Sequence, residues 1–424
     1  MRIFKGIFFS TFFLSFWGVA QVEYAREIMT ELCSEEYKGR GYVDNGDSLA
    51  ADFIAEELKN IGIDPVNKDG YFQEYDLNVN TFPYSIEVKL DDSLLKSGED
   101  YLVNPMSGTA QGIFKVIPIN SSNYFTAYGG KVSPEENAKD QIIYAFNFTD
   151  YKPGDKLNEI RKNAYQIAQF FPVIWVTNQK QMYSVGRFHF NYPIIEIDSC
   201  AYTATEEVYL KVNNKYIPKY HSQNVIGKIQ GKKKRKYIVF SAHYDHLGMM
   251  GTESMFPGAN DNASGVAMLL SLAKYYAANK PEYTIYFCFF SGEEAGLEGS
   301  KYFVSHPLFK LKRVKFVLNI DIMGGAEDGI TLVNGTKHEE AFAKMAEINT
   351  ANNYLNKIKK RGPTANSDHY YFSEAGIPSF FVYSMGDVKN YHDVYDTAEN
   401  TTLGKFDAVE SLMKKFLSQY GFKL

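Results

Sequence analysis

The sequence predicts an α/β protein with a largely parallel, doubly wound mixed sheet, helices on both faces and a smaller β-rich inserted domain. The first observation is the alternation of strand-like and helix-like runs over residues 221–424, which is typical of parallel sheets because each parallel strand needs a crossover connection. The second is a block of short β-type runs over residues 101–220. The third is length: 424 residues, 45% of them hydrophobic, suffice for one large domain and a smaller one.

The N-terminal residues differ from the rest of the chain. Arg2 and Lys5 give a positive start, residues 7–17 are largely apolar, and Gly18-Val19-Ala20 offers small residues for cleavage. This pattern predicts a signal peptide over residues 1–20. The alternative is a membrane anchor, but the apolar run is shorter than the roughly 20 residues that a span needs. We therefore expect an exported protein, periplasmic or extracellular, without a stable membrane span.

Residues 21–100 form the predicted first part of the main domain. A helix is expected over residues 22–32, and a clear amphipathic helix over residues 47–61, with Asp47 as its cap and Gly62 as its end. Strands are expected over residues 71–75 and 86–90.

Residues 101–220 form the predicted insert. Its strands are expected at 114–119, 141–148, 172–176, 193–197 and 208–212, with one helix at 156–170. No residues here have the spacing of metal ligands or of a nucleophile and its base. We interpret the block as a domain that covers or restricts the active site; the alternative is an independent functional module.

Residues 221–424 form the predicted main part of the domain. Strands are expected at 224–229, 237–242, 284–290, 314–320 and 379–383, and helices at 261–279, from 300, at 339–353 and at 405–420. A basic run at residues 232–235 is interpreted as a solvated turn. With a formal net charge of −5, we expect no nucleic-acid partner.

The three cysteines do not form a disulfide framework, because their number is odd. Cys288 lies in an apolar strand and is expected to be a buried thiol. A bridge between Cys33 and Cys200 is left open. None lies in a nucleophile context, so cysteine catalysis is not expected.

Polar groups that bind metals follow several predicted strands. His243 ends one strand, with Asp245 two residues on, where it is expected to accept the second N–H of the imidazole. Glu293 and Glu294 follow another strand, and two adjacent carboxylates there are costly unless a cation or proton shares the site. The remaining groups are Asp261 before a helix, Asp321 after a strand and His392 in a polar loop.

Each group also has a structural interpretation when taken alone: Asp261 is a good helix cap, and the others fit surface loops. His246 is expected to be structural or to lie behind the ligands. Five metal-competent groups beyond the strands of one α/β unit are harder to explain as caps and loops. Two histidines and three carboxylates suit zinc. A di-zinc site polarises a carbonyl and activates water without a serine or cysteine nucleophile.

The motifs AHYDH, GANDNASG, SGEEAGLEGS, LNIDIMG, SDHYYFSEAGIP and YHDVYDT resemble those of the secreted co-catalytic di-zinc exopeptidases, the group of bacterial leucyl aminopeptidases and glutamate carboxypeptidases. The resemblance covers residues 224–397, and the insert loosely resembles a protease-associated domain. The resemblance implies two zinc ions per chain. It implies that His243 and Asp321 bind one zinc, that Glu294 and His392 bind the other, and that Asp261 lies between them with a cis peptide to Asn262. It further implies that Glu293 is the general base and that Asp245 supports His243.

The expected function is therefore that of a zinc-dependent exopeptidase acting on peptides, and most simply an aminopeptidase. A carboxypeptidase or dipeptidase is the enzymatic alternative, although a carboxyl-end enzyme needs an arginine cluster, and none is seen. A non-catalytic binding protein on a peptidase scaffold is the other alternative. Arg361, Tyr383 and Tyr391 are either substrate contacts or ordinary surface and packing residues. The Ser367-Asp368-His369 cluster is expected to have a structural role near the site. Oligomeric state is left open.

Overall fold

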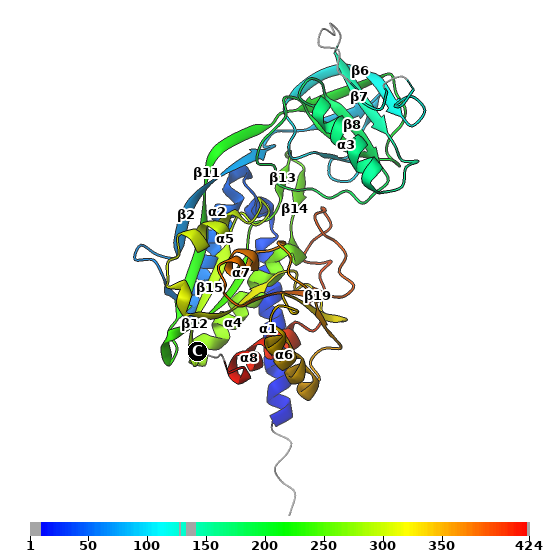
Figure 1. Ribbon diagram of the computed structural model, residues 1–424. Helices are drawn as coiled ribbons and strands as arrows, with labels where there is room; N and C mark the ends of the chain where they lie inside the picture. The colour runs from blue at the N-terminus through cyan, green and yellow to red at the C-terminus, as the bar shows by residue number, and fades with distance from the viewer. Residues whose placement is uncertain (1–9, 127–128, 133–140, 422–424) are drawn as a thin grey trace, which may run out of the picture.

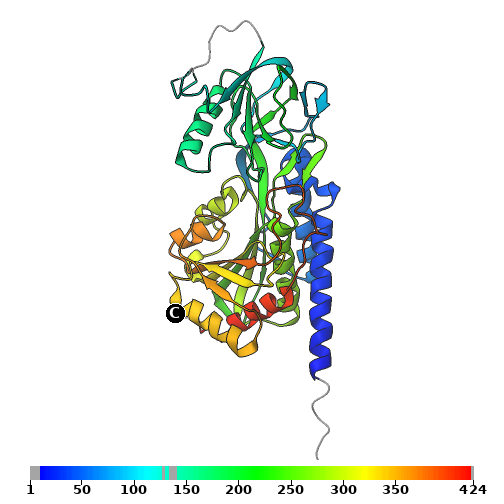
Figure 2. The ribbon, with the colours of Figure 1, turned by 90° about the vertical axis from the view of Figure 1, so that its right-hand side faces the viewer.

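The computed structural model describes residues 10–126, 129–132 and 141–421. The predicted signal peptide, residues 1–20, lies partly outside them. Within the described residues the chain forms two large sheets, one above the other in Figure 1. Helix α1 (Ser10–Leu32) runs along one side of the lower part, as Figure 2 shows. No helix of the described residues is both long and apolar enough to cross a membrane.

The main sheet is mixed, as predicted: its centre is parallel, and an antiparallel pair joins the centre to the flanking strands on each side. Its order is β1-β11-β15-β12-β16-β19-β17-β18, and β2 pairs with β11. The four central strands run parallel: β15 (Tyr283–Phe290), β12 (Lys233–His243), β16 (Val314–Ile320) and β19 (Ser379–Met385). The flanking strands are β1 (Asp64–Pro65), β2 (Phe72–Thr81), β11 (Lys215–Ile229), β17 (Gly329–Val333) and β18 (Ile358–Lys360).

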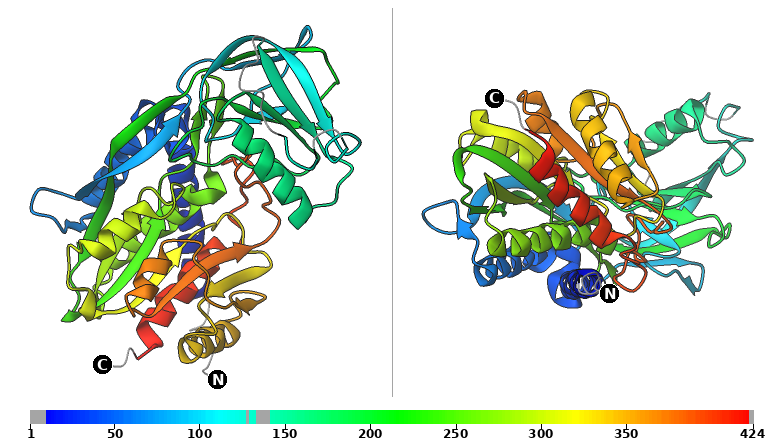
Figure 3. Two further views of the ribbon diagram at one scale, coloured as in Figure 1. Left: turned by 45° about the horizontal axis from the view of Figure 1, so that its top comes forward. Right: turned by 90° about the horizontal axis from the view of Figure 1, so that it is seen from below.

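Helices cover both faces of this sheet because its central strands are apolar on both sides. In β12, Ile238 and Phe240 belong to one core, while Tyr237 and Val239 belong to another. Successive strand residues face opposite sides, so each face needs its own cover. The first core includes helices α1, α2 (Gly46–Ile61), α4 (Ser264–Ala278), α6 (Glu339–Asn352) and α8 (Phe406–Gln419); the second includes α5 (Glu298–Ser305) and α7 (His369–Glu374). Figure 3 shows the sheet between these layers.

The second sheet has the order β4-β3-β10-β6-β7-β8-β9-β5 and one packed helix, α3 (Asp155–Ile167). Its strands are β3 (Glu87–Leu90), β4 (Ser93–Leu94), β5 (Tyr101–Val103), β6 (Ala110–Asn120), β7 (Ile142–Asn147), β8 (Val173–Thr177), β9 (Ile194–Asp198) and β10 (Glu207–Val212). The strand predicted at residues 86–90 pairs here with β10, although we had placed it in the main domain. The alternating pattern of residues 86–90 predicts a strand, but it does not show with which other strand this one pairs.

An antiparallel ribbon joins the two sheets. Strand β2 leads into the second sheet and β11 leads out of it, and they pair from Phe72 with Val225 to Thr81 with Lys215. Beyond Val225, β11 continues beside β15 in the main sheet. Figure 1 shows this ribbon as the curved connection between the two parts.

Helix α2 is anchored to the ribbon by a residue that we had interpreted as its cap. Asn45 occupies the N-cap position, and Asp47 is fully buried. The Asp47 carboxylate accepts hydrogen bonds from the hydroxyl groups of Tyr220 and Ser222 on β11. The predicted end of the helix is confirmed, because Gly62 is its C-cap with φ of 87°.

Candidate metal centre

The predicted site residues gather at the carboxyl ends of neighbouring parallel strands. His243 is the last residue of β12, Asp321 follows β16, and Glu293 and Glu294 follow β15. Parallel strands bring these ends to one edge of the sheet. The turn after β15 needs a glycine: Gly292 has φ of 66°, and a Cβ there would lie 2.5 Å from the hydroxyl of Tyr75.

Asp261 lies between the two predicted histidine ligands. Its Oδ1 is 3.2 Å from Nε2 of His243, and its Oδ2 is 3.1 Å from Nε2 of His392. The residue belongs to the short helical turn η3 (Ala259–Ala263) before α4, and its peptide bond to Asn262 is cis. Gly258 precedes the turn with φ of 61°, and a Cβ there would lie 2.3 Å from the His246 ring. One carboxylate thus faces both imidazoles.

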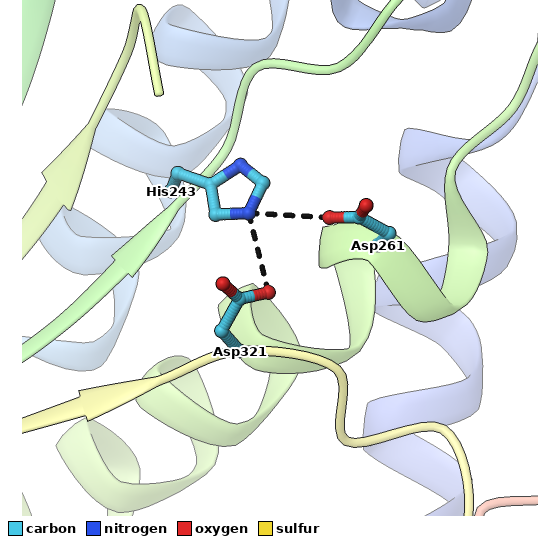
Figure 4. Close-up of side chains that lie close together, drawn as sticks. All are labelled: His243, Asp261 and Asp321. Carbon is cyan, nitrogen blue, oxygen red and sulfur yellow. Dashed lines mark hydrogen bonds and ion pairs between the residues drawn. The ribbon is translucent and has the colours of Figure 1, made fainter. Parts of the chain in front are cut away.

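The first group of donors is His243, Asp261 and Asp321, shown in Figure 4. Nε2 of His243 lies 3.2 Å from Oδ1 of Asp321. The other oxygen of Asp321 accepts a hydrogen bond of 2.9 Å from Ser367, which itself accepts one of 2.8 Å from Asn319. Ser367, from the motif that we expected to be structural, thus holds Asp321 in place.

The second group joins Glu294 to two histidines. Oε2 of Glu294 lies 3.3 Å from Nε2 of His392, and its Oε1 accepts a hydrogen bond of 2.8 Å from Nδ1 of His246. His246 is fully buried, and its donor atom also falls into a cluster with Asp261 and Glu294. The structure therefore places His246 directly against a predicted ligand.

Asp245 contacts His243 differently from the prediction. Nδ1 of His243 donates to the backbone carbonyl of Asp245 at 3.1 Å, whereas the carboxylate is 3.8 Å away. The carboxylate instead accepts the backbone N–H groups of Glu293 at 3.2 Å and Glu294 at 3.3 Å, and the hydroxyl of Tyr42 at 3.2 Å. The i, i+2 spacing placed the two residues on one side but could not show which oxygen the ring would reach.

His392 lies in the loop after β19. Its Nδ1 donates to the backbone carbonyl of Tyr183 at 3.0 Å. Its Nε2 faces Asp261 and Glu294 and has no hydrogen-bond partner among the described residues. The ring of Tyr391 stacks on that of His392, with 3.9 Å between the ring centres.

The carboxylates of this cluster raise the pKa values of its imidazoles. Burial lowers the pKa of His392, but Glu294 and Asp261 raise it more, to about 11. Burial likewise lowers the pKa of His243, and Asp321 and Glu293 bring it well above its ordinary value. Burial raises the pKa of Glu293 well above its usual range, and the charges of Glu294 and Asp321 add to this effect. Excess negative charge in a buried site is what a cation neutralises.

The donor set fits zinc. Imidazole nitrogen and carboxylate oxygen are the ligands that zinc prefers besides thiolate. The donor atoms of the first group lie within 4.8 Å of one another. The same holds for the donor atoms of His246, Asp261 and Glu294, and for those of His243, Glu293 and Glu294. Nε2 of His392 lies 3.1 Å from an oxygen of Asp261 and 3.3 Å from an oxygen of Glu294, so these three donor atoms face one another, as the ligands of one ion do.

A cavity of about 280 Å³ opens beside these groups. Arg361 is at its wall and donates a 3.4 Å hydrogen bond to the hydroxyl of Tyr383. The cavity is therefore bordered by all three residues whose roles the sequence left open: Arg361, Tyr383 and Tyr391. The cavity is lined by His243, Asp261, Glu293, Asp321, Ile322, Arg361, Asn366, Phe381, Tyr383 and Tyr391.

Sequence reasoning missed Arg40, which is fully buried behind the site. Its guanidinium donates to the backbone carbonyls of Tyr244 at 2.8 Å, Pro257 at 2.6 Å and Gly258 at 2.6 Å. It thereby joins the loop after His243 to the loop before Asp261. Its place in the exposed-looking sequence KGRG gave no signal of burial.

An α/β sheet that gathers histidines and carboxylates at the carboxyl ends of its strands, beside a cavity, is an arrangement typical of metal-dependent hydrolases. Comparison of the sequence with known protein families narrows this class further. Residues 224–417 match the model of peptidase family M28, so this part of the chain is similar to the peptidases of that family.

Individual proteins are similar to this chain over different shares of its length. Aminopeptidase YwaD of Bacillus subtilis is 27% identical over 371 residues, which are 81% of this chain and 74% of that protein. A vacuolar membrane protease of Kluyveromyces lactis is 34% identical over 173 residues, but these are only 41% of this chain and 16% of that protein. The structure of BSAP, a zinc aminopeptidase from Bacillus subtilis, has the same fold, with a TM-score of 0.66, 20% identity and 94% of each chain covered.

Proposed function

We propose that this chain is a zinc-dependent aminopeptidase that binds two zinc ions. The observation that carries the proposal is the Asp261 carboxylate, with one oxygen 3.2 Å from His243 and the other 3.1 Å from His392. One carboxylate that faces two imidazoles suits a ligand shared by two metal ions. The similarity to an aminopeptidase over 81% of this chain supports the amino-end specificity.

The residues divide into two sets of ligands and a base. His243 and Asp321 would hold one zinc, Glu294 and His392 would hold the other, and Asp261 would be a ligand available to both. Bound zinc supplies a Lewis acid and makes water a stronger nucleophile. Glu293 accepts a proton from the attacking water and returns it to the leaving nitrogen.

The structure supports Glu293 as the base in two ways. Its side chain borders the cavity in which a substrate carbonyl would lie. Its backbone N–H is fixed by Asp245, so the turn that carries it is held in place. Glu294, the next residue, points to His392 and His246 instead. Adjacent carboxylates therefore have different surroundings, as the division of roles requires.

The test combines metal analysis with Glu293→Gln. We expect two zinc ions per chain, and a Glu293→Gln protein that keeps its zinc but loses at least about 100-fold in kcat, the lower range for general base catalysis. Glu298→Gln is the matched control, because Glu298 lies on α5 and pairs with Arg187. Fewer than two zinc ions per chain, or a normal rate in Glu293→Gln, would refute the proposal.

One observation favours carboxyl-end specificity as the second candidate. Arg361 borders the cavity, and a guanidinium binds a carboxylate well. Peptides blocked at one end or the other separate the two candidates. An aminopeptidase fails on the acetylated peptide and cleaves the amidated one, and Arg361→Met then changes its KM little. The reverse pattern identifies a carboxypeptidase.

The predicted export completes the proposal. Residues 1–20 are the proposed signal peptide, and the mature chain would begin at Gln21. Mass spectrometry of the N-terminus of the protein recovered outside the cytoplasm tests this. A chain recovered there with Met1 still present would contradict cleavage.

A further inference from the structure

The connection between β8 and β9, residues 178–193, leaves the second sheet and contacts the metal centre. We refer to it as the β8–β9 loop. In the main part, the loop after β19 rises toward the second sheet and meets it (Figure 1). The region that we predicted to cover the site thus contacts one of the predicted ligands, His392.

The central contact is between Tyr183 and His392, and it is reciprocal. Nδ1 of His392 donates to the carbonyl of Tyr183 at 3.0 Å, and the backbone N–H of Tyr183 donates to the carbonyl of His392 at 2.9 Å. A ring nitrogen that donates to a carbonyl fixes the tautomer and leaves the other nitrogen free to bind metal. Here the other nitrogen, Nε2, is the one that faces Asp261 and Glu294.

The backbone of His392 needs this support. Its φ is 54°, in the left-handed region, which costs a residue with a side chain free energy unless its surroundings hold it there. One hydrogen bond with Tyr183 holds the ring of His392, and the other holds its main chain. They therefore fix the direction of the imidazole at two points.

Other contacts hold the β8–β9 loop against the main part. Nζ of Lys180 lies 2.6 Å from Oδ2 of Asp393 and donates to the carbonyl of Lys389 at 3.1 Å. The buried ring of Tyr183 stacks on Phe256, with 4.5 Å between ring centres and 15° between planes. Phe256 ends β14 (Ser254–Phe256), which pairs with β13 (Gly248–Met250). The chain then runs from Phe256 to the turn that carries Asp261.

We propose that the second sheet completes the metal centre: through the backbone of Tyr183, the β8–β9 loop positions His392, and zinc affinity on the Glu294–His392 side depends on this contact. The inference rests on the proposed di-zinc function. Tyr183 is a positioning residue, because it acts through His392 and not on substrate.

The test measures zinc affinity, not only activity. Metal-free protein is titrated with zinc in competition with a chromophoric chelator, which resolves a tighter and a weaker site. Tyr183→Ala removes the ring that is stacked on Phe256 and frees the loop. We expect it to weaken zinc binding at one site by about 10-fold or more, the range seen when outer supports of metal ligands are lost. Tyr183→Phe keeps the ring and the main chain and should restore the affinity.

Lys180→Met provides a milder variant whose folding is not in question, because half of that side chain is exposed. It should weaken the same site by about 2- to 5-fold, as expected from an exposed ion pair. Lys211→Met is the matched control: Lys211 pairs with Glu87 inside the second sheet, away from the loop. It should leave both affinities unchanged.

The outcomes separate the two proposals. Wild-type protein that binds fewer than two zinc ions contradicts the proposed function itself. Wild-type protein with two zinc ions, and wild-type affinity in both Tyr183→Ala and Lys180→Met, contradicts only the role of the loop. If Tyr183→Ala fails to fold, the comparison of Lys180→Met with Lys211→Met decides.

Discussion

The carboxylate of Asp245 accepts the backbone N–H of Glu293 at 3.2 Å. Its second oxygen accepts the N–H of Glu294 at 3.3 Å. The residue therefore holds the turn that carries the proposed base and a proposed ligand, in addition to its backbone contact with His243. Burial raises the pKa of Asp245 to about 7, an increase that the nearby His243 opposes.

We predict that Asp245→Ala lowers kcat by about 100-fold while KM changes much less, because a displacement of roughly 1 Å in a catalytic group has an effect of that size. Steady-state kinetics and zinc content together provide the measurement. Tyr42→Phe removes one of three hydrogen bonds to the same carboxylate and should have a smaller effect. An Asp245→Ala enzyme with an unchanged rate would show that the turn holds its shape without this residue.

Replacing Arg40 should destabilise the fold strongly. Arg40→Met leaves several buried carbonyl groups without a donor, and each such loss costs about 1–3 kcal/mol. We expect the free energy of unfolding in urea to fall by about 3 kcal/mol or more. Arg26→Met is the control, because Arg26 also donates to carbonyls, those of Ala398 and Thr401, but in a partly exposed position. If the free energy of unfolding fell equally in both variants, burial would not be the reason for the effect of replacing Arg40.

The buried Asp47 should make stability depend on pH. Burial raises its pKa from 3.8 to about 6, and the hydroxyl groups of Tyr220 and Ser222 reduce that rise. The folded protein therefore binds a proton more tightly than the unfolded chain does. The stability from this group is complete below about pH 4 and is lost as the pH rises through about 6.

The comparison of wild type with Asp47→Asn isolates that contribution. The free energy of unfolding of wild type, relative to Asp47→Asn, should fall between about pH 4 and about pH 7, by at most about 3 kcal/mol for a shift of this size. Urea unfolding at both pH values measures it. A difference that is constant with pH would show that Asp47 does not titrate in this range.

The three thiols should differ in reactivity. All are free; Cys200 is exposed and Cys288 is buried in β15. Burial raises the pKa of Cys33 to about 11 and that of Cys288 well above its usual range, and the thiolate is the reactive form. We expect one fast-reacting thiol per native chain at about pH 8 and three after denaturation. Cys200→Ser should abolish the fast phase; if it persists, Cys33 is more accessible than its burial indicates.

The sequence predicted the elements of the main sheet well because their patterns are local. The strand expected over residues 314–320 is β16 (Val314–Ile320), and the helix expected over 339–353 is α6 (Glu339–Asn352). Apolar runs that end at charged residues define such elements almost completely. The pairing of strands was less predictable: the strand expected at residues 86–90 exists as β3, but it pairs with β10 in the second sheet.

The site was predictable to the extent that its residues come directly after strands. The structure brings His243, Asp261, Asp321, Glu294 and His392 together, as the sequence suggested. Their supports were not predictable. Tyr183 acts through its backbone, which has no sequence signature, and its partner is 209 residues away. Arg40 donates to carbonyls, which every residue has, so no charged partner marks its role.

The ribbon of β2 and β11 lets the chain enter and leave the second sheet at one place, where Thr81 pairs with Lys215. Antiparallel neighbours of this kind need only a two-residue turn to join them. By topology alone, the segment that forms the second sheet could be inserted or deleted without changing the order of the strands in the main sheet. His392 donates a hydrogen bond to the carbonyl of Tyr183, so a protein that lost this segment would need another carbonyl to hold that histidine.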